Sequence, residues 1–155
     1  MEGNKLLEPQ YLDFSVQSMV STFGQFELRK VDNVLVTRLI GQLDLDTMKA
    51  ATQQVVPLVK SMAGPWASLV DYTQWELYTE DTVEALIRFQ EWALAHNHAV
   101  EVAVIGNSSL KKQAREKLLS QLTHRPQQMY FETEKEAWDW LVQHEYCRDQ
   151  AHEKS

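Results

Sequence analysis

Short polar side chains stand directly before one of the helices that the sequence predicts. Asn107, Ser108 and Ser109 precede Leu110, where an apolar pattern of helical spacing begins. The unpaired N–H groups and the dipole at a helix start favour negative charge, so these residues could cradle an anion or carry a phosphorylated serine. The helix behind them has more basic than acidic residues as far as Arg125. A solvated helix start with an ordinary cap explains the same residues without a ligand.

A pair of histidines is the second group that could do chemistry. His96 and His98 are separated by one residue, a spacing that can begin a metal site. Such a site needs a third and usually a fourth ligand, and the sequence near the pair offers neither. The single cysteine, Cys147, stands alone. We therefore predict no metal site, and ordinary histidines in the loop before a strand.

Three carboxylates stand near the ends of predicted strands. Asp44, Asp46 and Asp71 could meet at the carboxyl edge of a sheet, where open α/β folds bind ligands. We interpret Asp44 and Asp46 chiefly as helix caps, since a carboxylate oxygen accepts the first N–H groups of a helix. The sequence contains no glycine-rich phosphate loop and no Gly-x-Ser-x-Gly turn. It therefore predicts no catalytic residue and no cofactor.

The composition is that of one folded domain. The chain has 155 residues, of which 44% are hydrophobic and 24% charged. The formal net charge of -7 works against binding to nucleic acid or to an anionic membrane. No basic segment followed by an apolar core resembles a signal peptide, and no apolar run approaches the roughly 18 residues that span a bilayer. We expect a cytoplasmic protein.

Hydrophobic periodicity and turn residues predict the elements that position these groups. An N-terminal arm over residues 1–22 precedes a domain over residues 23–146, and a polar tail follows over residues 147–155. Within the domain, the predicted strands cover residues 26–31, 34–40, 66–71, 100–105 and 128–131. The predicted helices cover residues 44–62, 79–96, 110–122 and 133–144. Pro57 predicts a kink or an early end of the first helix near Val55. The order ββαβαβαβα is typical of an α/β fold with a mixed sheet of about four to five strands and right-handed crossovers.

The predicted helix over residues 79–96 has more apolar surface than packing on a sheet requires. One face fits a sheet and contains Val83, Leu86, Ile87, Gln90, Ala93 and Leu94. An adjoining face contains Ala85, Phe89, Trp92 and His96. We predict that this second face is an interaction surface, together with Trp75 and Tyr78 in a loop over residues 75–82. The N-terminal arm or a second copy of the chain is the cover that we expect, and a partner or an apolar ligand is the alternative.

The stretch Val34–Thr47, which contains Gly-Gln-Leu-Asp, resembles the opening of STAS domains, the fold of anti-sigma-factor antagonists. Three later segments resemble that family in the same order, namely Leu69–Asp71, Ile105–Leu110 and Phe131–Ala137. The resemblance covers about residues 24–141. Within the STAS superfamily, the chain resembles the SpoIIAA-like branch. This resemblance implies a bacterial, cytoplasmic regulatory module that works through a protein partner or as a homodimer.

One part of the sequence departs from that family. Typical antagonists carry an Asp-Ser-Ser-Gly motif, with the phosphorylated serine, at the start of the second helix. The hydroxyls here are Thr79 and Thr82, and the carboxylates of Glu80 and Asp81 lie between them. These acids would repel a phosphate. They either imitate a phosphorylated state or simply favour the positive end of the helix.

Two functions of different classes follow. The first is a non-enzymatic regulatory or protein-interaction module of STAS-like fold. The alternative is a small-molecule binder for a lipid-like or anionic ligand, with a cleft between the second helix and the sheet edge. An enzyme ranks third, because the sequence alone brings no acid and base together.

Overall fold

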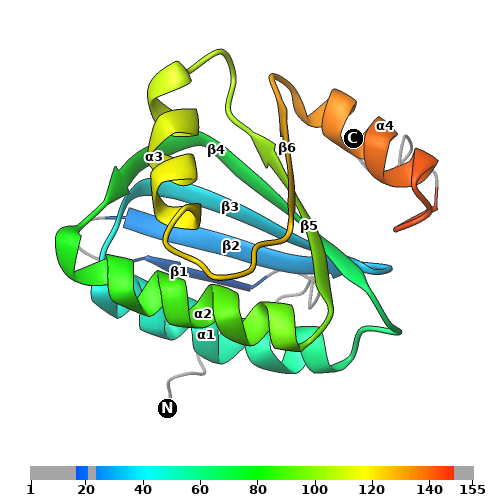
Figure 1. The fold of residues 1–155 in the computed structure, drawn as a ribbon, viewed down its shortest axis with the longest axis horizontal. Helices are drawn as coiled ribbons and strands as arrows, with labels where there is room; N and C mark the ends of the chain where they lie inside the picture. Colours follow the sequence, from blue (N-terminus) through cyan, green and yellow to red (C-terminus); the bar gives the residue numbers. More distant parts are fainter. Residues whose placement is uncertain (1–16, 21–23, 149–155) are drawn as a thin grey trace.

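The computed structural model describes residues 17–20 and 24–148 (Figure 1). Its elements, in chain order, are β1 (Gln17–Val20), β2 (Gly24–Val31), β3 (Val34–Leu43), α1 (Leu45–Lys60), β4 (Trp66–Tyr78), a 3-10 turn (Glu80–Thr82), α2 (Val83–Ala95), β5 (His98–Val104), α3 (Ser109–Leu119), β6 (Gln127–Phe131) and α4 (Glu134–Gln143). From β2 onward this order is ββαβαβαβα, as the sequence predicts. The fold class is therefore confirmed.

The strands form one mixed sheet in the order β1-β2-β3-β4-β5-β6. Neighbours from β1 to β3 are antiparallel, and neighbours from β3 to β6 are parallel. Strand β1 lies within the predicted N-terminal arm and adds an edge strand that the sequence analysis did not predict. The rest of the arm, residues 1–16 and 21–23, and residues 149–155 of the predicted tail lie outside the described residues.

Helices cover the two faces of the sheet unequally (Figure 1). Buried residues of α1, α2 and α3 pack with strand residues in one core cluster, and α4 packs in a separate one. Alternate residues of β5 face opposite ways, so Val100 and Val102 join the α4 cluster whereas Ala103 joins the other. Cys147 is also buried in the α4 cluster, so the folded unit includes the first residue of the predicted tail.

Local signals in the sequence set most helix starts. Asp44 caps α1, its side chain accepting a hydrogen bond from the Thr47 backbone N–H at 3.1 Å. Thr133 and Glu136 form a reciprocal capping box at the start of α4. Helix α1 continues through Pro57 to Lys60 instead of ending near Val55. Burial of apolar side chains on both sides of the proline, such as Val59, offsets the missing backbone hydrogen bond.

Strand β4 is longer than the sequence predicts. It continues to Tyr78 and pairs with β3 as far as Leu43, where the prediction had a loop over residues 75–82. The apolar side chain of Trp75 is only 2% exposed, and its burial favours continued pairing over an exposed loop. None of the described helices combines the length and apolar character that a membrane crossing requires.

Candidate functional site

A cavity of about 100 Å³ lies between the sheet and helices α1 and α2. Strands β2 and β3 and both helices contribute apolar side chains to its wall, among them Leu28, Leu39, Met48, Leu86 and Phe89. Polar side chains enter the wall from β4, β5, α2 and α3. The cavity therefore has a large apolar part and a polar part of mixed origin.

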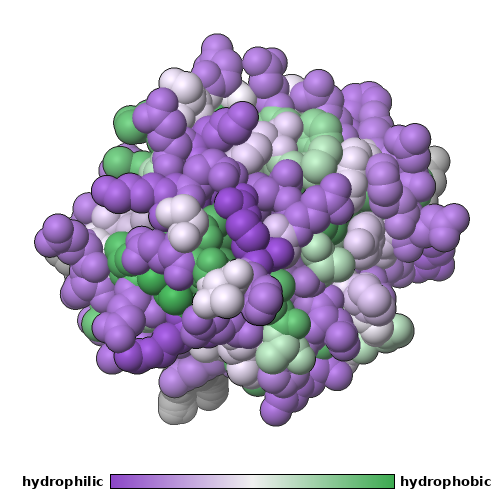
Figure 2. All heavy atoms as spheres, viewed as in Figure 1, coloured by the Kyte–Doolittle hydropathy of each residue, from purple (hydrophilic) through white to green (hydrophobic). Residues whose placement is uncertain are grey.

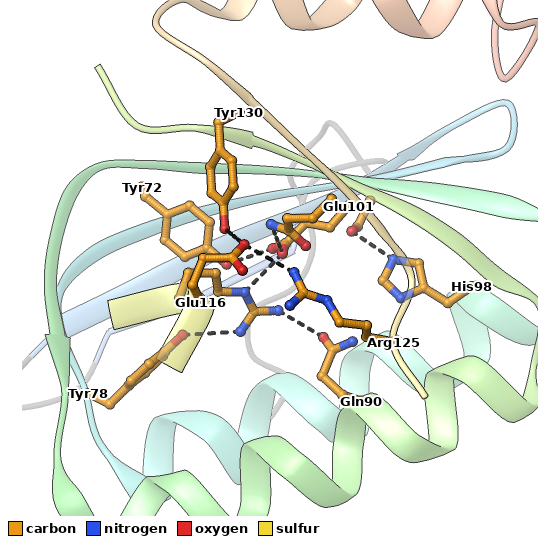
Figure 3. A network of polar contacts seen from close by, with 11 residues as sticks. Tyr72, Tyr78, Gln90, His98, Glu101, Glu116, Arg125 and Tyr130 are labelled. Carbon is orange, nitrogen blue, oxygen red and sulfur yellow. Dashed lines mark hydrogen bonds and ion pairs between the residues drawn. The ribbon is translucent and has the colours of Figure 1, made fainter. Parts of the chain in front are cut away.

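The polar part is built around an ion pair (Figure 3). Glu101 of β5 is 1% exposed and Arg115 of α3 is 4% exposed, and the Arg115 Nε lies 2.9 Å from Glu101 Oε1. Tyr72 donates its hydroxyl proton to Glu101 Oε2 at 2.6 Å, and the Gln128 amide donates to Oε1 at 2.6 Å. Arg115 also donates through Nη1 to the Tyr78 hydroxyl at 3.1 Å.

Both members of this pair stay ionised. Burial alone would raise the pKa of Glu101, but the Arg115 charge and the hydrogen bonds from Tyr72 and Gln128 hold it below its ordinary value. Burial alone would lower the pKa of Arg115, and the Glu101 charge raises it instead. Burial also raises the pKa of Tyr72 well above 10, so this phenol remains neutral. The polar part thus contains one positive and one negative charge.

Gln90 of α2 leaves a hydrogen-bond donor in this polar part. Its Oε1 accepts from Arg115 Nη2 at 3.0 Å, and because a guanidinium only donates, this contact fixes which way the amide points. The amide nitrogen, Nε2, is buried and has no hydrogen-bond partner among the described residues. A buried donor without an acceptor costs about 1–3 kcal/mol. This position therefore favours an acceptor brought in from outside the chain.

The two histidines of the predicted pair occupy different environments. His98 lies in β5 and not in a loop; its ring stacks on Trp66 with centroids 4.4 Å apart, and its Nε2 is 2.9 Å from Ser68 Oγ. Burial lowers the pKa of His98 to about 4, so the imidazole is neutral near pH 7. His96 caps α2 and its Nδ1 lies 2.8 Å from the Trp92 carbonyl oxygen. Within the described part of the chain, no three metal-ligating side chains come together.

The predicted interaction surface is divided by the structure. Phe89, Trp92 and His96 form a stack of half-buried rings on α2, with centroid distances of 6.0 and 4.3 Å, and Ala85 is also half-buried. Trp75 is instead a core residue, packed between the rings of Tyr72 and Tyr78, and the hydroxyl of Tyr78 points to Arg115. Trp75 therefore offers no surface to a partner.

The apolar surface on the side of the molecule with α2 and α3 in front is broken into small areas by polar side chains (Figure 2). A partner that docks on this side would meet mixed chemistry. Phe89 has two roles, since it belongs to the ring stack and also lines the cavity.

The hydroxyl groups of Thr79 and Thr82, near the start of α2, already form hydrogen bonds within the protein. Thr82 is 0% exposed, donates to the Leu43 carbonyl at 3.2 Å and lies 2.5 Å from the Thr79 hydroxyl. Thr79 in turn donates to Asp81 at 2.6 Å. Phosphorylation of Thr82 would require this segment to open.

The start of α3 is an ordinary cap. Ser108 accepts from the Lys111 backbone N–H at 3.2 Å, and Asn107 and Ser109 beside it are exposed. The Lys111 ammonium donates to the carbonyl groups of Tyr72 and Thr73, both at 2.8 Å. Arg115 points into the core, so two cations of the predicted basic helix are already in use.

Asp71 lies at a separate site on the α4 side. It shares a hydrogen bond with Glu134, and the Arg38 guanidinium lies 3.6 Å from each carboxylate. Burial and the Asp71 charge raise the pKa of Glu134, whereas hydrogen bonds from Thr73 and Glu134 lower that of Asp71 against the effect of burial. The carboxyl pair therefore has one preferred proton position, on Glu134. Asp44 remains a cap and does not belong to this group.

Sequence reasoning missed the polar part of the cavity. A signal was present, because Glu101 is the one charged residue in the apolar run Val100–Ile105. A carboxylate inside a strand that is buried on both faces needs a charged partner. The identity of that partner could not be read from sequence, since Arg115 stands among other cations of α3.

The comparisons with known proteins agree with this architecture. A family model described as SpoIIAA-like matches residues 34–142. An uncharacterised Shewanella loihica protein of SpoIIAA-like fold is 18% identical, with a TM-score of 0.60 over 79% of this chain and 98% of that one. The unphosphorylated anti-sigma factor antagonist SpoIIAA is also 18% identical, with a TM-score of 0.51 over 75% of this chain and 96% of that one. No curated protein has a significant match to the sequence.

Proposed function

The chain belongs to the SpoIIAA-like family, and from that premise we propose that it is a regulatory module that responds to a small apolar molecule held between the sheet and helices α1 and α2. A structural neighbour, SpoIIAA, is an anti-sigma factor antagonist. The fold accordingly suggests a regulatory protein-interaction module. We propose in addition that the small apolar molecule is the signal to which this module responds.

The cavity is the observation that carries this proposal. Apolar pockets lined by Leu, Met and Phe side chains bind small apolar molecules, because transfer of apolar surface from water is favourable. Phe89 links the cavity to the outside, since it lines the wall and belongs to the ring stack on the surface of α2. A molecule that displaces Phe89 would change the surface that a protein partner meets.

Xenon is a suitable probe, because it tests access to an apolar cavity without regard to polar recognition. The wild-type protein should shift the xenon NMR resonance in a saturable way. Ala51 of α1 lines the cavity and Ala50 does not, so Ala51→Leu should abolish saturable binding and Ala50→Leu should leave it. Equal xenon binding by both variants would contradict the proposal.

Protein isolated from its own cells provides a second test. Its native mass should exceed its denatured mass by a small non-covalent increment. Equal native and denatured masses per chain would argue against a resident molecule of useful affinity.

A protein contact through α2 is a second candidate function, favoured by the ring stack of Phe89, Trp92 and His96. Three half-buried rings in contact are a common feature of interface centres. We propose a second copy of the chain as the partner, and the oligomeric state is the test, described in the Discussion.

We also propose that the module is not an enzyme and acts in the cytoplasm. The charged groups of the cavity support the first point. Glu101 and Arg115 neutralise one another and are held by Tyr72 and Gln128, so neither is poised to transfer a proton.

A further inference from the structure

The polar part of the cavity determines which ligands fit it, provided that the proposed ligand-binding function holds. The oxygens of Glu101 accept three hydrogen bonds, from Tyr72, Gln128 and Arg115. The Nε, Nη1 and Nη2 atoms of Arg115 each donate to an acceptor of the protein. Each nitrogen and oxygen of the ion pair therefore has at least one hydrogen-bond partner within the protein.

This balance decides the charge of the ligand. A carboxylate or phosphate brought beside the pair would add a second negative charge to a buried site with one cation. An ammonium group would add a second positive charge. A neutral molecule leaves the balance as it is, so the lipid-like but not the anionic version of the ligand predicted from the sequence fits the structure.

Gln90 and His98 each bring a buried polar atom without a hydrogen-bond partner among the described residues to the cavity wall, Nε2 and Nδ1 respectively. Of the two, Gln90 Nε2 is the atom whose character as a donor is fixed. Arg115 fixes the Gln90 Oε1, so the amide turns its Nε2 donor away from the ion pair. That nitrogen is buried without a partner, and Gln90 lines the cavity. A hydrogen-bond acceptor in the cavity would satisfy it, whereas a group that only donates would not.

We infer that the cavity selects a neutral apolar molecule with one acceptor oxygen, such as a ketone, and that Gln90 Nε2 donates the hydrogen bond to that oxygen. The cavity of about 100 Å³ fits a compact group of a few carbon atoms. Gln90 is thus a specificity-determining residue of the proposed site.

The experiment uses three probes of similar size on the full chain. Cyclopentanone is neutral and has an acceptor, methylenecyclopentane has the same shape without one, and cyclobutanecarboxylate is an anion. Affinities are measured by methyl NMR titration for the wild type and for Gln90→Met, which removes the donor. Gln113→Met, at an exposed position of α3, is the matched control.

The expected result is a loss of about tenfold in cyclopentanone affinity in Gln90→Met, with methylenecyclopentane affinity unchanged or higher. Comparison of each probe between variants removes the difference in hydration between the probes. Gln113→Met should match the wild type, and the carboxylate should bind at least tenfold more weakly than the ketone.

A second measurement guards against misfolding. Gln90→Met should keep the near-UV circular dichroism spectrum of the wild type, so that a loss of ketone affinity reports the missing donor and not an unfolded chain. Equal loss of both neutral probes in Gln90→Met, or carboxylate binding as strong as ketone binding, would overturn the inference while xenon binding still supports the proposed function. Loss of xenon binding in the wild type would overturn both.

Discussion

Glu101 of β5 and Arg115 of α3 form an ion pair in the interior, with Nε and Oε1 2.9 Å apart and both side chains buried. Such a pair adds little net stability over apolar residues of the same volume, because desolvation of the charges offsets their attraction. We expect its main effect to be on conformational specificity. It fixes the position of α3 over β5, orients the Gln90 amide and keeps the polar part of the cavity neutral overall.

Removal of one charge from this pair should be costly. We expect Arg115→Met to lower the free energy of unfolding by about 3–5 kcal/mol, because Glu101 is left buried without its counter-ion. Urea denaturation measures the change. Arg88 pairs with Glu84 on the exposed side of α2, so Arg88→Met should cost no more than about 0.5 kcal/mol. Similar losses in both variants would contradict the buried-pair account.

His98 should make stability depend on pH. Burial lowers its pKa to about 4 from an ordinary 6.5, so the unfolded chain binds a proton over a range in which the folded chain does not. The contribution of His98 to the free energy of unfolding is fully present above pH 6.5, and it falls by up to about 3 kcal/mol as the pH drops to 4. The lowered pKa of Glu101 adds a loss of the same sign at acid pH.

The measurement is the free energy of unfolding at several pH values between 7 and 4 for the wild type and His98→Gln. The variant should have a shallower slope over this range. His144→Gln, at an exposed position after α4, is the control. An unchanged slope in His98→Gln would refute a buried neutral imidazole.

The ring stack on α2 predicts a change of assembly. Replacement of both Phe89 and Trp92 with Ser should give a folded monomer if a second copy covers this face, because the apolar contact area is lost. Light scattering over a concentration series measures the assembly. Because Phe89 also lines the cavity, the single variant Trp92→Ser tests the surface contact without changing the cavity wall. Arg88→Ser on the same helix is the control and should leave the assembly unchanged. A double variant that dimerises at the wild-type concentration would exclude this interface.

A negative charge should cost less stability at Thr79, beside Asp81, than at the buried Thr82. The Thr82 hydroxyl is fully buried and donates to the Leu43 carbonyl, so Thr82→Asp places a carboxylate against a carbonyl oxygen. We expect a loss of several kcal/mol in thermal or urea unfolding, compared with about 1 kcal/mol or less for Thr79→Asp. Equal stability of the two variants would show that the segment opens readily and would restore Thr82 as a modification site.

The order of the elements could be predicted from the sequence because its signals are local. Hydrophobic periodicity, the Asp44 cap and the Thr133–Glu136 capping box each act within a few residues. The family resemblance rests on the same kind of signal. Where local rules conflicted with packing, as at Pro57, helix α1 did not end early near Val55, because burial on both sides of the proline outweighed one backbone hydrogen bond.

The candidate site could not be predicted in the same way. The partners Glu101 and Arg115 come from different elements, and Gln90 joins them from a third. Trp75 changed from a predicted surface residue to a core residue because β4 continues beside β3. The sequence by itself determined which segments are helices and strands, since that depends on neighbours along the chain. Only the tertiary structure decided which charges meet and where the cavity lies, because both depend on how the helices pack across the sheet.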